Sequence, residues 1–163
     1  MTVSEVATKM IQYSQGNLQD INHFLKVYAY AKIIGECEQL DRETQTVLEV
    51  AAILHDIACP LCRKKYGNDA GPLQEAEGPA LAKEFLNNCG YPDEFVERVA
   101  FLIGHHHTLK DIQGMDYQIL IEADYLVNAD ENKYSEANIC TMMDRVFKTR
   151  TGISLLKSIY GIS

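Results

Sequence analysis

Apolar residues recur at intervals of three to four along most of the chain, which is the spacing of one face of an α-helix. In residues 17–38, for example, Leu18, Ile21 and Leu25 lie on one face. No segment alternates apolar and polar residues for as long as a half-buried strand requires. The pattern therefore predicts an all-α fold, a bundle of about seven helices.

Capping residues and helix breakers indicate where these helices begin and end. Asn17 and Asp41 are good N-cap residues, and Thr2 and Glu5 have the spacing of a capping box. After a short N-terminal helix we expect helices over residues 17–38, 41–56, 72–88, 93–107, 117–128, 135–147 and 153–160. A loop is expected at 59–71, where proline, glycine, asparagine and aspartate cluster.

Composition narrows the class of protein. The 163 residues are 47% hydrophobic and 23% charged, which is typical of a globular chain. We expect one domain over 1–163, with core motifs at about 20–130 and C-terminal helices at 135–160 packed on them. The net charge of -8 argues against a nucleic-acid polymer as partner. Without an apolar run of roughly 20 residues or a secretory signal, we expect no membrane partner and a cytoplasmic location.

Four residues stand out as candidate metal ligands. His55 and Asp56 follow the apolar run 51–54, and imidazole and carboxylate are both metal-ligand types. Asp124 lies on the apolar side of its expected helix, where a carboxylate is costly unless it is paired or binds an ion. Glu122, in contrast, is expected to face water. His23 lies near the start of the second long helix.

This ordered set on helices resembles the HD-domain superfamily of metal-dependent phosphohydrolases. The similar segments are HFLKVYAYAKII at 23–34, AAILHDIA at 51–58, LIGHHHT at 102–108 and ILIEADYLVN at 119–128. The resemblance implies that His23, His55, Asp56 and Asp124 bind a divalent ion that activates a water for hydrolysis of a phosphate ester. It also implies that Asp56 is both a ligand and the proton acceptor for that water.

Whether one or two ions bind depends on further residues. By alignment, His105 and His106 resemble a histidine pair of the dinuclear members, whereas the apolar positions Val99 and Ile103 favour His106 or His107 as inward-facing. The chain lacks the histidine that such members carry on the preceding helix, and Glu77 is a candidate oxygen ligand there. We expect His105, His106 and Glu77 to serve a second ion or the substrate phosphate.

Two lysines are candidate substrate contacts. Lys26 lies one turn after His23, where the family often has a basic residue, so we expect it to bind substrate phosphate and assist catalysis. Lys64 lies in the loop that is expected to border the cleft, and it is a second substrate-binding candidate. The nearby pair Cys59 and Cys62 lacks the second pair of ligands that a structural zinc site needs, so we expect reduced thiols without a metal role.

The sequence therefore predicts a hydrolase that cleaves a phosphate ester of a small metabolite or nucleotide. Its cofactor would be one or two divalent ions, with Mn, Fe, Co, Ni, Mg and Zn all compatible with such ligands. Its partner would be the small phosphorylated substrate, and a homo-oligomer is left open. The alternatives are a metal- and nucleotide-binding sensor without turnover and, with less support, a di-iron oxygenase-like enzyme.

Overall fold

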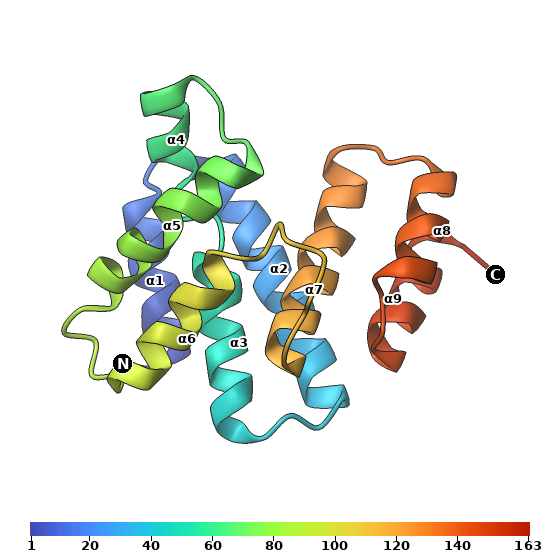
Figure 1. The fold of residues 1–163 in the computed structure, drawn as a ribbon, viewed down its shortest axis with the longest axis horizontal. Helices are drawn as coiled ribbons and strands as arrows, with labels where there is room; N and C mark the ends of the chain where they lie inside the picture. Colours follow the sequence, from blue (N-terminus) through green and yellow to red (C-terminus); the bar gives the residue numbers. More distant parts are fainter.

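The computed structural model describes residues 1–163, which form nine α-helices and no strand. In chain order the helices are α1 (Val3–Tyr13), α2 (Leu18–Cys37), α3 (Arg42–Leu54), α4 (Cys59–Tyr66), α5 (Gly71–Leu86), α6 (Asp93–Ile103), α7 (Met115–Glu131), α8 (Glu136–Arg145) and α9 (Arg150–Tyr160) (Figure 1). The all-α prediction is confirmed.

The predicted capping residues begin the first three helices. At α1, Thr2 N donates to Glu5 Oε2 at 2.7 Å and Glu5 N donates to Thr2 Oγ1 at 3.3 Å, which completes the capping box. The side chains of Asn17 and Asp41 cap α2 and α3. Because a cap acts on backbone groups only two or three residues away, these helix starts could be found from sequence alone.

The segment that was expected to be a loop contains helix α4. Pro60 lies in its first turn, where the missing N–H costs no hydrogen bond, and Gly67 ends it with a φ of 77°. Only Cys59 and Cys62 are buried in this helix. The apolar period is therefore too weak to predict a helix, although proline and glycine stand where they favour its start and end.

Helix α3 forms the centre of the bundle. All residues from 47 to 54 are buried, and α3 contacts α1, α2, α6 and α7 (Figure 1). The segment Arg42–Tyr66 is long and apolar enough to cross a membrane, but 72% of its most apolar window is buried inside the protein, as expected for a core helix. Since α3 ends inside the bundle, the residues that follow it are held in the interior.

Glu122 does not face water, in contrast to the prediction. It is fully buried, and its Oε1 accepts hydrogen bonds from Gln118 Nε2 at 2.7 Å, Lys148 N at 2.7 Å and Thr149 N at 3.0 Å. The hydroxyl of Thr149 donates to Oε2. These donors replace water around the carboxylate, so Glu122 joins α7 to the start of α9. Two of the donors are backbone groups more than 25 residues further along the chain, which a sequence pattern does not reveal.

The Glu122 contact leaves no room for a side chain at position 152. A Cβ at Gly152 would overlap Oε2 of Glu122 and lie 2.6 Å from Thr149 Oγ1. We expect Gly152→Ala to lower the free energy of unfolding by about 1–3 kcal/mol, measured by urea denaturation. Ser154→Ala, at an exposed position of the same helix, is the control and should change it by less than about 0.5 kcal/mol. Equal stability of the two variants would contradict this close packing.

Candidate metal centre

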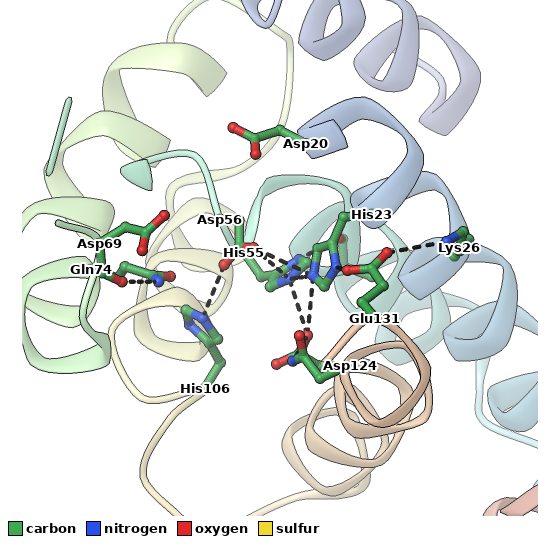
Figure 2. Close-up of polar contacts among 12 residues, drawn as sticks. Asp20, His23, Lys26, His55, Asp56, Asp69, Gln74, His106, Asp124 and Glu131 are labelled. Atoms are coloured by element: carbon green, nitrogen blue, oxygen red, sulfur yellow. Dashed lines mark hydrogen bonds and ion pairs between the residues drawn. The ribbon is translucent and has the colours of Figure 1, made fainter. Parts of the chain in front are cut away.

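Four helices deliver side chains to one point inside the bundle (Figure 2). His23 comes from the first part of α2, and Asp124 comes from the middle of α7. His55 and Asp56 follow directly after the last residue of α3. His106 lies just beyond the end of α6. The fold thus brings together residues that are up to 101 positions apart, from 23 to 124.

The inner atoms of four of these side chains surround one point. The Nε2 atoms of His23 and His55 are 3.1 Å apart. Oδ1 of Asp124 lies 3.2 Å from Nε2 of His23 and 3.5 Å from Nε2 of His55. Oδ2 of Asp56 lies 3.3 Å and 3.5 Å from the same two nitrogens. Adjacent ligands of an octahedral ion with bonds of about 2.1 Å are about 3.0 Å apart, so this spacing fits a bound ion.

The outer nitrogens of the two histidines fix which atoms face the centre. Nδ1 of His23 lies 2.8 Å from Oε2 of Glu131, and Nδ1 of His55 lies 2.8 Å from the carbonyl oxygen of Ala52. Because both acceptors require a proton on Nδ1, each neutral ring presents an unprotonated Nε2. Two lone pairs facing one another at 3.1 Å are unfavourable unless a cation lies between them. Either a proton or a metal ion meets that requirement.

The charges at this point also call for a cation. Burial lowers the pKa of His23, but its hydrogen bond to Asp124 and the charges of Asp56 and Asp124 outweigh burial and raise it to about 9. Burial opposes ionisation of Asp124, yet hydrogen bonds from His23 and His55 hold its pKa well below the usual range. The pKa of Asp56 is lowered likewise, against burial, by His55 and His106. Both carboxylates are therefore negative at neutral pH.

A second group of ligand atoms begins at the other oxygen of Asp56. Oδ1 lies 3.5 Å from Nε2 of His106, a buried nitrogen without a hydrogen-bond partner. Nδ1 of His106 donates to the carbonyl of Ile103 at 2.8 Å, and Nε2 of His107 lies 3.1 Å from Oε1 of Gln74. One ligand atom from each of Asp56, His106 and His107 lies within 4.8 Å of the others. The same holds for His23, His55 and Asp56.

These two groups have the chemistry of a divalent metal site. Burial and the neighbouring His106 lower the pKa of His107 to about 4, so this ring is neutral and can act as a ligand. Asp56 directs one oxygen to each group, so it can bridge two ions. Imidazole nitrogen and carboxylate oxygen suit Mn, Fe, Co, Ni and Zn, and the carboxylates also suit Mg. The cluster can therefore hold a divalent ion, and the buried Nε2 of His106 is the atom that a second ion would satisfy.

His105 lies outside this centre, which corrects the alignment of His105 and His106 as the inward pair. Its Nδ1 donates to the carbonyl of Phe101 at 2.7 Å, and its ring stacks on Phe101 with centroids 4.1 Å apart. Residues 101 and 105 are one helical turn apart and share the outer face of the chain as it leaves α6. The helical-face prediction, which favoured His106 or His107, agrees with the structure.

Glu77 also lies outside the centre. Its Oε1 pairs with Lys65 Nζ at 2.6 Å and accepts a hydrogen bond from the Tyr66 hydroxyl at 2.5 Å. Both partners belong to α4, which was expected to be a loop. Their pairing with Glu77 was therefore not predicted. On α5, the helix that also carries Glu77, Gln74 is buried and contacts His107.

The two candidate lysines do not line the cleft above the ligands. Lys26 Nζ lies 3.1 Å from Oε1 of Glu131, whose other oxygen accepts the hydrogen bond from His23 (Figure 2). Lys26 thus reaches the centre only through Glu131. Lys64 is exposed on α4. Neither lysine is positioned for direct contact with a phosphate at the ligand cluster.

A polar cleft of about 270 Å³ opens above the ligands, and Arg63 is its basic residue apart from the histidines. Its lining residues are Gln19, Asp20, His23, Asp56, Cys59, Arg63, Asp69, Gln74, His107, Asp124, Asn128, Glu131 and Asn132. Arg63 pairs with Asp20 and, at 2.8 Å, with Asp69. Arg63 was not predicted, because a loop has no helical face that would distinguish it from its neighbour Lys64. Helical spacing was a usable signal for Asp20, three residues before His23, and for Glu131, seven residues after Asp124.

The two cysteines of α4 are free and buried. Cys59 borders the cleft, but burial raises the pKa of its thiol far above neutrality. A protonated thiol is a poor ligand and a poor nucleophile. Neither cysteine belongs to a group of metal-ligating atoms.

Comparison with known proteins supports this interpretation of the site. The family model described as HD domain matches residues 20–147. The crystal structure of a predicted HD superfamily hydrolase from an uncultured Thermotogales bacterium is similar, with 23% identity, a TM-score of 0.71, and coverage of 97% of this chain and 84% of that one. YpgQ of Bacillus subtilis has 19% identity and a TM-score of 0.65, with 99% and 90% coverage. These two likenesses concern the fold. No curated protein matches the chain significantly.

Binding of a divalent ion should release a proton from His23. In the metal-free protein the pKa of about 9 keeps this ring protonated at neutral pH, whereas a ligand must present a lone pair. We expect calorimetric titration with Mn²⁺ at about pH 7.5, in buffers of different ionisation enthalpy, to show release of about one proton or more per ion. Uptake without proton release would contradict the proposed His23 ligand.

The same shift predicts how the stability of the metal-free protein depends on pH. A pKa raised from 6.5 to about 9 adds stability that is fully present below pH 6.5 and is lost as the pH rises through 9. Urea denaturation of the metal-free protein across this range measures that loss.

Proposed function

The chain belongs to the HD-domain family, and on that premise we propose that it hydrolyses a phosphate ester of a small metabolite or nucleotide. In this proposal His23, His55, Asp56 and Asp124 bind a divalent ion. One observation supports it above the others: the Nε2 atoms of two imidazoles, 3.1 Å apart, share a buried point with two ionised carboxylates. That point lies at the floor of an open cleft.

When bound, a divalent ion lowers the pKa of water and offsets the charge of a phosphoryl group. Asp56 is ionised and partly open to the cleft, so its carboxylate would be placed to accept a proton from the attacking water. Glu131 and the Ala52 carbonyl bind Nδ1 of His23 and of His55, respectively, and so orient both rings with Nε2 toward the centre. The chain's residues thus orient the reactants, and hydrolysis transfers the phosphoryl group from an alcohol to water.

Arg63 replaces the two lysines as the proposed phosphate-binding residue. Its guanidinium lines the cleft and can donate two parallel hydrogen bonds to phosphate oxygens. In the free protein it pairs with Asp20 and Asp69. An incoming phosphate would exchange with one of these carboxylates.

The cleft has an excess of negative charge that makes substrate binding depend on the ion. Without metal, the positive charges in its lining are the guanidinium of Arg63 and the protonated ring of His23. Five carboxylates oppose them, and they are Asp20, Asp56, Asp69, Asp124 and Glu131. A phosphate alone would be repelled by this set. One or two divalent ions neutralise the carboxylates at the cleft floor, and substrate affinity should therefore require them.

The first test is phosphate release from a panel of phosphomonoesters with Mn, Fe, Co, Ni, Mg or Zn. We expect Asp56→Asn to lower kcat by about 10²–10⁴-fold while the helical circular dichroism signal is unchanged. Asp130→Asn removes the same charge at an exposed position of α7 and should retain activity. Stoichiometric ion binding without phosphate release from any ester would instead support the sensor alternative.

The second test compares neighbouring cations of α4. We expect Arg63→Ala to raise KM for the hydrolysed ester by about 10-fold, because a charged hydrogen-bond donor to the phosphate is lost. Lys64→Ala should leave KM unchanged, since Lys64 is exposed and does not line the cleft. An unchanged KM for Arg63→Ala, or a raised KM for Lys64→Ala, would reverse this assignment.

A further inference from the structure

The turn that carries His106 and His107 lies beyond the end of α6, so the hydrogen bonds of that helix do not hold it. His106 is buried, whereas His107 is exposed. Within the turn, the backbone N of Thr108 donates to the carbonyl oxygen of His105 at 2.8 Å. The placement of both histidines therefore depends on what fixes the four residues 105–108.

The carboxylate of Glu75, on α5, binds this turn from outside. Its Oε1 accepts hydrogen bonds from the backbone N of His107 at 3.0 Å and from the hydroxyl of Thr108 at 2.9 Å. A backbone N–H just past a helix end has no partner in the helix and needs an acceptor from elsewhere. Oε1 of the neighbouring Gln74 lies 3.1 Å from Nε2 of His107. One turn of α5 thus holds both the backbone and the ring of His107.

Tyr117, on α7, binds the same turn from the other side. Its hydroxyl lies within hydrogen-bonding distance of two carbonyl oxygens, at 2.9 Å from that of His105 and 2.6 Å from that of Thr108. The side chain is only 1% exposed, so the core fixes where this hydroxyl lies. Glu75 therefore binds donors of the turn, and Tyr117 binds its acceptors.

Close packing of α5 against α6 sets the position of Glu75. A Cβ at Gly78 would lie 2.6 Å from Cγ2 of Ile103, and a Cβ at Gly71 would lie 2.9 Å from Cγ of His107. Gly71, Glu75 and Gly78 are spaced by four and three residues, so they share one face of α5. The packing of this face, and not the carboxylate itself, brings Glu75 to the turn.

We propose that Glu75 is a positioning residue of the metal centre, which fixes the turn so that His106 and His107 bind a divalent ion together with Asp56. Nε2 of His106 lies 3.5 Å from Oδ1 of Asp56, and a ligand atom of His107 lies within 4.8 Å of both residues (Figure 2). Glu75 itself does not line the polar cleft, so it acts through the turn. This inference rests on the metal-binding part of the proposed function and does not require hydrolysis.

The test is calorimetric titration of the metal-free protein with Mn²⁺. We expect Glu75→Ala to weaken one Mn²⁺-binding step by about 10–100-fold, the usual effect of losing a residue that orients metal ligands. Glu75→Gln removes the charge but keeps an oxygen that accepts both hydrogen bonds, so it should retain the wild-type affinity. Glu84→Ala removes a carboxylate from an exposed position of α5 and is the control, with unchanged Mn²⁺ binding.

A second variant tests the turn without changing Glu75. Tyr117→Phe keeps the ring in the core and removes the hydroxyl that binds the two carbonyls, and we expect it to weaken the same Mn²⁺-binding step. Urea denaturation of each metal-free variant verifies that it is folded. Wild-type affinity in Tyr117→Phe would show that metal binding does not depend on the turn and would overturn the inference.

The outcomes for Glu75 separate this inference from the proposed function. Wild-type Mn²⁺ affinity in Glu75→Ala, or a loss in Glu75→Gln as large as in Glu75→Ala, would overturn the positioning role and leave the phosphohydrolase proposal standing. The expected Mn²⁺ affinities without release of phosphate from any ester would support the positioning role and contradict the proposed hydrolysis.

Discussion

The meeting of two imidazole lone pairs and two carboxylates inside the bundle is the constraint on which the rest of the structure depends. His23 and His55 face each other at 3.1 Å, with Asp56 and Asp124 within 3.5 Å of both. Such groups repel one another unless a cation joins them. Burial of the apolar run of α3 holds them together, and the raised pKa of His23 shows that a proton takes this role when no metal is bound.

Around this centre, hydrogen bonds to the outer nitrogens of the histidines determine how each ring is oriented. The outer nitrogens bond to backbone carbonyls at His55 and His106, to Glu131 at His23 and to an amide at His107. At His23, His55 and His106, this bond leaves Nε2 facing the centre. This layer explains why Lys26, which was expected to touch substrate, pairs with Glu131: its charge balances the carboxylate that orients His23.

The polar cleft above the centre makes phosphate binding depend on the metal. Its carboxylates outnumber the positive charges of Arg63 and of protonated His23, so a phosphate needs the ion. The α-helical framework is shared by proteins of different activities, so the proposed substrate is argued from this cleft and not from the fold.

Features that depend on near neighbours could be determined from the sequence: the helical period, the caps Asn17 and Asp41, and Asp124 as a candidate ligand on an apolar helix face. Contacts between distant segments could not. The sequence left open whether His105 or His107 turns inward, and it placed Glu122 in water although its partners lie more than 25 residues away. A cap or a helix face acts within about four residues, whereas the surroundings of a side chain depend on which helices pack beside it. Tertiary packing therefore decided which other polar groups join the four predicted residues at the centre, which support them through hydrogen bonds and which remain on the surface.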